Sequence, residues 1–156
     1  MSQPIGQYFD CLIEGERKSF YIRPDVFSEA TMTRLAAYVK AKRSEARKEM
    51  LRDIADVAKD LPKETVAAMT AEVVKDGLGH NLVDYETALQ ALQSADGEGI
   101  AIALEMNCEG INSRAEARKV MGAYPNMAEL MAKVVQAGMS ALEAAQEYDP
   151  KSQQGN

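Results

Sequence analysis

The residues best suited to catalysis are few and widely separated, with one His and two Cys in 156 residues. His80 lies in a Gly-containing stretch and could act as a general base, because imidazole titrates near neutral pH. No nucleophile or orienting carboxylate accompanies it at a fixed spacing, and general acid–base catalysis needs a positioned set of groups. Cys11 is expected in mid-strand as a small apolar side chain, and the charge of Glu109 would raise the pKa of an adjacent Cys108 thiol. We therefore predict no catalytic residues and a protein that is not an enzyme.

Two glycine-containing segments offer weak candidates for ligand sites. Residues 96–100 (Asp-Gly-Glu-Gly-Ile) carry two carboxylates, but they lack the alternating ligand spacing of a calcium loop. Residues 77–79 (Gly-Leu-Gly) are not followed by the Lys-Ser/Thr pair that completes a phosphate-binding loop. Both segments are interpreted as turns between helices. We predict neither a metal site nor a cofactor.

Charge is distributed unevenly along a chain whose net charge is −6. Residues 40–52 hold six basic side chains against Glu45 and Glu49, whereas seven acids and no Lys or Arg lie between Lys75 and Arg114. The negative net charge and the single nearby aromatic residue, Tyr38, argue against nucleic acid as a partner. Solvated helix faces are the favoured interpretation of both segments. The alternatives are a phosphate-binding surface at residues 40–52 and self-assembly guided by the two opposite charges.

A β-hairpin is predicted at the N-terminus. Residues 8–14 and 19–23 are rich in aromatic and β-branched side chains and flank a turn at Gly15. Alternation places Phe9, Cys11 and Ile13 on one face of the first strand, and Phe20 and Ile22 on one face of the second. Because an isolated hairpin is marginal in water, we expect residues 1–27 to pack on the helical part of the chain or to swap onto another copy.

Helix signals dominate from residue 28 onward. Ser28 is the expected N-cap of a helix through about residue 59, and its apolar stripe weakens around Arg43 and Ala46, which predicts a bend or break near Ser44. Pro62 suits the first turn of a second helix, in which one face is lined by apolar residues: Val66, Met69, Val73 and Val74.

The second half of the chain carries three further cap signals. Asp84 is expected to cap a helix over residues 85–94, Ser113 begins a capping box completed by Glu116, and Asn126 precedes a helix over about residues 127–145. Residues 100–104 fit a strand or a helix, and their helical surroundings favour a short helix. Gly138 suggests close packing within the last helix. The expected fold is α+β and mostly α, with a hairpin, a multi-helix bundle over residues 28–147 and a flexible tail over residues 148–156.

The apolar composition has two interpretations. Aromatic residues make up 6% of the chain and there are nine Met, and Met both fills irregular cores and serves adaptable binding surfaces. No apolar stretch approaches the ~20 residues that span a bilayer. Two separated Cys and the lack of a signal peptide indicate a reducing compartment. We expect a cytoplasmic protein without a membrane partner.

Two segments near the C-terminus, residues 110–120 (Gly-Ile-Asn-Ser-Arg-Ala-Glu-Ala-Arg-Lys-Val) and residues 126–131 (Asn-Met-Ala-Glu-Leu-Met), carry a resemblance to a known family. With the N-terminal hairpin and the helical body, they resemble the small tail assembly chaperones of long-tailed bacteriophages and prophages. The resemblance implies binding to the tape-measure protein during tail assembly, as an oligomer in the host cell cytoplasm. It carries over no catalytic residues.

Surfaces for a protein partner are expected on the hairpin and on the last helix. The candidate residues are aromatic or Met: Phe9, Phe20, Tyr21, Met127, Met131 and Met139. The main alternative function is a phage virion structural or connector protein that forms oligomers through its hairpin and helices. A small enzyme using His80 or Cys108, and a nucleic-acid-binding regulator using residues 40–52, are less favoured.

Overall fold

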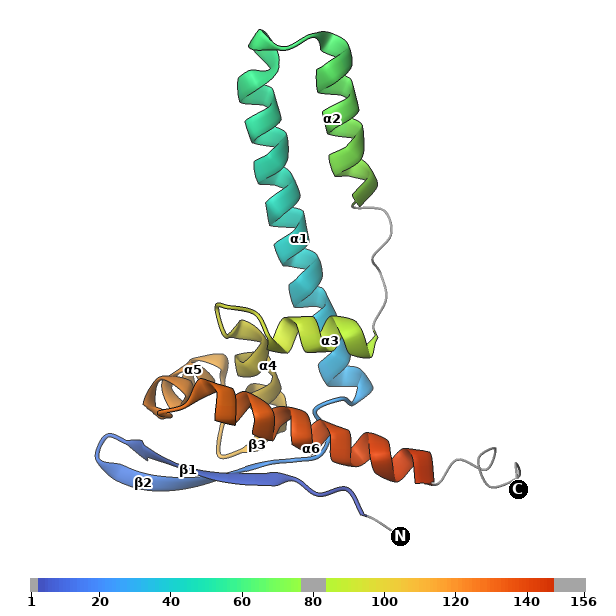
Figure 1. Ribbon diagram of the computed structural model, residues 1–156. Helices are drawn as coiled ribbons and strands as arrows, with labels where there is room; N and C mark the ends of the chain where they lie inside the picture. The colour runs from blue at the N-terminus through green and yellow to red at the C-terminus, as the bar shows by residue number, and fades with distance from the viewer. Residues whose placement is uncertain (1–2, 77–83, 148–156) are drawn as a thin grey trace, which may run out of the picture.

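The computed structural model describes residues 3–76 and 84–147. A small antiparallel sheet and four helices form a base, from which two antiparallel helices project as a stalk (Figure 1). We define the stalk as residues 44–76. The prediction of an α+β, mostly α protein with an N-terminal hairpin is confirmed. His80 and the predicted tail lie outside the described residues.

The sheet is built on the predicted hairpin. Strand β1 (Gln7–Ile13) pairs with β2 (Glu16–Ile22), and Ile13 lies opposite Glu16 across a two-residue turn. Glu14 and Gly15 have φ values of 54° and 81°, the positive values that a type I′ turn requires and that Gly adopts without strain. A third strand, β3 (Cys108–Glu109), pairs with the end of β2 opposite Tyr21 and Ile22. The sequence does not predict β3, because two residues are too few to show an alternating pattern.

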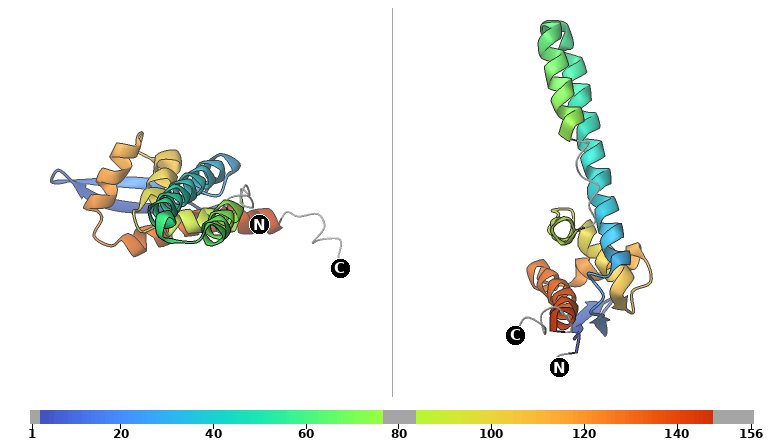
Figure 2. Two further views of the ribbon diagram at one scale, coloured as in Figure 1. Left: turned by 90° about the horizontal axis from the view of Figure 1, so that it is seen from above. Right: turned by 90° about the vertical axis from the view of Figure 1, so that its right-hand side faces the viewer.

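One face of the sheet packs on helices of the same chain. The inward side chains alternate along the strands as predicted and are buried against α5 and α6: Phe9, Cys11, Ile13, Phe20 and Ile22. The opposite face is open, and Tyr8 and Leu12 lie exposed on it. The view from above in Figure 2 shows α5 crossing over the sheet and α6 running along one side of it.

Helix α1 (Glu29–Val57) runs without interruption from the core of the base to the tip of the stalk. Ser28 caps it by accepting the N–H of Thr31. Thr31 and Leu35 are buried in the base. The predicted bend or break near Ser44 is wrong, because α1 contains no Gly or Pro and the residues around Ser44 are good helix formers.

The stalk is completed by a short turn and a second helix. A single 3₁₀ turn (Ala58–Asp60) follows α1, and α2 (Lys63–Asp76) then runs back alongside it. Val66 N–H donates to the carbonyl of Pro62 at 3.2 Å, so that Pro62 precedes the first helical residue. The pairing of α1 with α2 follows from one apolar face on each helix.

Four helices form the rest of the base: α3 (Tyr85–Leu92), α4 (Glu98–Asn107), α5 (Arg114–Ala123) and α6 (Met127–Glu147). Helix α4 lies at the centre, where seven of its ten residues are buried. A helix that is covered on all sides is apolar on all sides, which explains why residues 100–104 lack a helical period. The preference for a helix there is confirmed.

The predicted caps at Asp84, Ser113 and Asn126 are all present. Asp84 accepts the N–H of Thr87 at 2.7 Å, and Asn126 accepts the N–H of Glu129 at 3.1 Å. Ser113 accepts the N–H of Glu116 at 3.1 Å. The Glu116 carboxylate reaches back to the N–H of Asn112 at 2.7 Å, one residue earlier than in the usual capping box.

Candidate partner-binding groove

Two of the six predicted contact residues lie inside the protein. Phe9 and Phe20 are only 4% and 5% exposed. Their rings stack at 5.2 Å, and the ring of Tyr124 packs edge-on against Phe9 at 5.6 Å. Their placement on a partner surface is therefore corrected: the alternation that puts them on one strand face also turns them toward α5 and α6, where they form core.

The other four residues do not form a common surface. The Tyr21 ring lies 4.6 Å from that of Tyr8 on the outer face of the sheet. Met131 and Met139 are partly buried and pack against the core, with the sulfur of Met139 accepting the hydroxyl of Tyr85 at 2.8 Å. Met127 is exposed at the start of α6. The structure thus assigns Met131 and Met139 mainly to packing and leaves Tyr21 and Met127 on separate elements.

Exposed apolar side chains are instead concentrated on the stalk. Of the nine large hydrophobic residues that are exposed in the described part of the chain, five lie there: Met50, Leu51, Val57, Met69 and Val74. Only Ile54 is buried among the described stalk residues. Two helices alone cannot cover one another as the helices of a larger bundle do, so these apolar side chains stay exposed.

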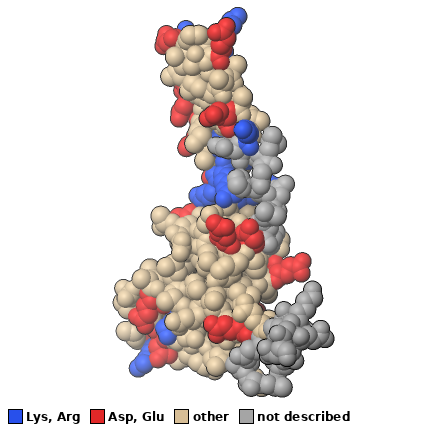
Figure 3. All heavy atoms as spheres, turned by 45° about the vertical axis from the view of Figure 1, so that its right-hand side comes forward, with Lys and Arg blue, Asp and Glu red and all other residues tan. Residues whose placement is uncertain are grey.

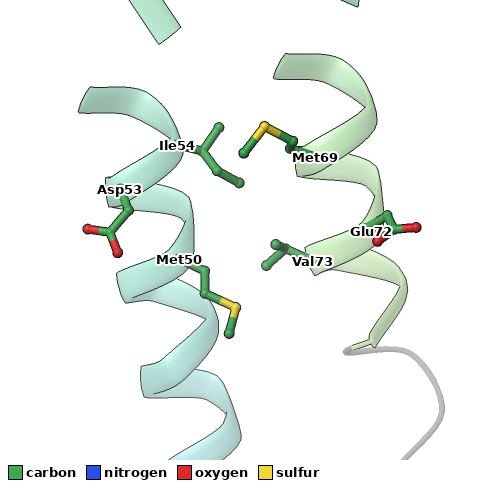
Figure 4. Close-up of a pocket in the computed structure, with 6 residues that line it drawn as sticks. All are labelled: Met50, Asp53, Ile54, Met69, Glu72 and Val73. Carbon is green, nitrogen blue, oxygen red and sulfur yellow. The ribbon is translucent and has the colours of Figure 1, made fainter. Parts of the chain in front are cut away.

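A groove of about 410 Å³ lies along one flank of the stalk. Met50 and Ile54 of α1 and Met69 and Val73 of α2 point toward the space between the two helices (Figure 4). Asp53 and Glu72 stand at its outer edges. An apolar floor of this kind can bury the side chains of a further helix, whereas it offers no nucleophile or imidazole for bond-making chemistry.

The groove follows from the spacing of apolar residues along the two stalk helices. Met50, Ile54 and Val57 recur at steps of four and three on α1, and Val66, Met69 and Val73 recur at steps of three and four on α2. Such residues share one face of a helix. These stripes are recognisable in the sequence, but whether they fill a core or form a binding surface stays open there, because spacing does not reveal how many helices meet.

The two thiols of the chain are poorly suited to nucleophilic chemistry. Burial raises the pKa of Cys108 to about 12, and it also raises the pKa of Cys11. Because the thiolate is the reactive form, both side chains are inert in the folded protein. Among the described residues, no group of His, Cys, Asp and Glu is arranged to hold a metal ion.

A second hollow of about 400 Å³ lies between α1 and α3, where the stalk joins the base. Its polar groups are paired: Asp96 accepts the hydroxyls of Tyr38 and Ser94 and the N–H of Glu98. These hydrogen bonds, and the Lys42 ammonium at 3.4 Å, hold the pKa of the Asp96 carboxyl well below its usual range. The segment at residues 96–100 therefore starts α4 and ties it to α1.

No match to the chain was found among protein-family models, curated proteins or solved structures. No helix within the described residues has both the length and the apolar character needed to cross a membrane. The groove on the stalk is thus the feature from which a function can be argued.

Proposed function

We propose that this protein is a non-enzymatic assembly chaperone that binds an apolar helical segment of a partner protein along its stalk. The observation that carries the proposal is the concentration of exposed apolar side chains on two projecting helices. An apolar patch that a fold leaves uncovered marks an interaction site. A groove between two antiparallel helices has the shape that receives a third helix.

The dimensions and composition of the groove suit a helical client. Helix α2 has 14 residues and extends about 21 Å at ~1.5 Å per residue, so a client helix of about four turns would lie alongside it. Met50 and Met69 are unbranched and flexible, which lets them adapt to different client side chains. A chaperone that must accept several helical segments benefits from such adaptable contacts.

Within this proposal, the client is the tape-measure protein of a long-tailed bacteriophage, bound in the host cytoplasm during tail assembly. The support is the resemblance at residues 110–120 and 126–131, whose two helix starts form the caps at Ser113 and Asn126. A chaperone should leave before the particle is finished. A protein inventory of purified virions tests this point, because a stoichiometric complement of this chain would favour the structural or connector alternative.

The groove itself is tested by replacing Met50 and Met69 together with Gln. Both side chains are substantially exposed, at 53% and 38%, so the fold should tolerate the change. Burying a Met side chain against a partner is worth about 1.5–3 kcal/mol, so we expect the affinity for a co-expressed tape-measure segment to fall at least about tenfold. Isothermal titration calorimetry with the purified segment measures this loss.

The matched control is Leu12→Gln, which removes an apolar side chain that is 66% exposed on the outer face of the sheet. This variant should bind the segment like the wild type. Full binding by the Met50/Met69 variant, or a loss confined to Leu12→Gln, would move the client site from the stalk to the hairpin and refute the proposal.

A further inference from the structure

A row of carboxylates runs along one ridge of α1 beside the groove. Glu45, Glu49, Asp53 and Asp56 follow one another at steps of four, four and three, and residues at these steps lie one above the other on a helix. All four are exposed. Within the described part of the chain, none of them is in an ion pair with another described residue. Lys48 lies three residues from Glu45, and Arg52 lies three residues from Glu49 and four from Asp56, so these carboxylates have basic neighbours on the same helix. Asp53 is the one carboxylate of the row without a Lys or Arg at such a spacing.

Of these four carboxylates, only Asp53 is among the residues that line the groove. Asp53 lines the groove directly, and Glu72 stands on the opposite rim, on α2 (Figure 4). At about 100° per residue, Lys48 and Arg52 project away from the groove, and Glu45 and Asp56 project within about 20–40° of Arg52. In Figure 3, Lys and Arg gather where the stalk leaves the base, and both signs of charge appear higher on the stalk. A segment lying in the groove thus meets carboxylates on both sides.

We propose that the groove selects an amphipathic helix whose apolar stripe is flanked by Lys and Arg. This inference rests on the proposed function and names the chemistry of the client. Each exposed ion pair at such a rim contributes little to affinity. Rim charges nevertheless fix the register, raise the association rate and reject helices with acidic flanks, which would be held close to Asp53 and Glu72.

The selection is measured with three labelled peptides that share one Leu stripe and differ only in flanking residues: Lys, Gln or Glu. Each is titrated with the full chain by fluorescence anisotropy at low and high salt. We expect the Lys-flanked peptide to bind about tenfold more tightly than the Glu-flanked peptide at low salt. The difference should shrink at high salt, because exposed charges are screened.

Two charge-removing variants locate the effect. Asp53→Asn with Glu72→Gln should reduce the preference for the Lys-flanked over the Glu-flanked peptide severalfold. The control, Glu16→Gln with Glu109→Gln, removes two exposed carboxylates from the sheet and should retain the full preference. A preference that survives in the Asp53/Glu72 variant would overturn the inference.

The remaining outcomes separate this inference from the proposed function. Equal binding of the Lys- and Glu-flanked peptides would overturn charge selection and leave helix binding intact. Binding of no peptide would refute both. Sedimentation analysis tests whether a second copy of the chain occupies the groove. If the chain self-associates and the Lys-flanked peptide does not displace the second copy, the inference is wrong.

Discussion

The close approach of α3 and α4 at Gly99 permits a sharp prediction about stability. A Cβ atom added to Gly99 would lie 1.8 Å from the carbonyl oxygen of Ala91 and 2.3 Å from its carbonyl carbon. Real Cβ atoms essentially never come closer than 3.0 Å to such an atom. In Gly99→Ala, α3 and α4 must therefore move apart by at least about 1.2 Å, the difference between 3.0 and 1.8 Å. The obstacle is backbone, which cannot rotate away as a side chain would.

The cost follows from what surrounds these two helices. Leu92 of α3 and Leu104 of α4 are fully buried, and a gap of 0.5–1 Å already forfeits a quarter to a half of the dispersion energy across a contact. Overpacking of this kind costs about 3 kcal/mol. The better helix propensity of Ala returns about 1 kcal/mol, which leaves a net loss of about 2 kcal/mol.

Urea unfolding followed by circular dichroism at 222 nm measures the change in the free energy of unfolding. A loss of about 2 kcal/mol corresponds to a fall in Tm of about 4–8 °C for a chain of this size. The matched control is Gly122→Ala on α5, where the added Cβ meets nothing within 4 Å and should stabilise by about 0.4–1 kcal/mol. Equal stability of Gly99→Ala and Gly122→Ala would refute the reasoning from close approach.

Three further predictions concern the base. The Asp96 carboxyl has a lowered pKa in the folded state, so its stabilising effect is present above the unfolded pKa of about 3.9 and is lost as the pH falls below it. Asp96→Asn should therefore lower stability at pH 7 and flatten the acid branch of a stability–pH curve, and an unchanged acid branch would contradict this. Burial raises the pKa values of Cys11 and Cys108, so iodoacetamide at pH 8 should label neither thiol in the native chain and both thiols in urea. Intact-mass spectrometry measures the labelling, and labelling of the native chain would be inconsistent with the burial. Ser113→Ala removes the side-chain acceptor for the N–H of Glu116 and should cost about 1 kcal/mol, measured by urea unfolding.

Local signals in the sequence predicted most of the fold. Gly15 adopts the positive φ angle that the hairpin turn requires. The caps at Asp84, Ser113 and Asn126 occur where short polar side chains precede apolar runs. Each of these depends on residues within four positions of one another. Local chemistry therefore suffices to place them.

The parts that the sequence did not reveal depend on distant contacts. Strand β3 exists only because Cys108 and Glu109 lie against Ile22 and Tyr21. Among the described residues, α2 is the one helix beside the outer half of α1, and the stripes on the two helices do not reveal this. Phe9 and Phe20 were expected at a surface, yet they became core because α5 and α6 cover that face of the sheet.

The unbroken course of α1 has a mechanical consequence. Its first turns are anchored through the buried Thr31, whose hydroxyl accepts the side-chain amide of Asn107 at 3.0 Å, and through Leu35. Its last turns carry the groove, and no Gly or Pro lies between them to serve as a pivot. A polypeptide bound near the tip would therefore keep a fixed orientation relative to the sheet. A force on that polypeptide would be transmitted along α1 to the buried residues of the base.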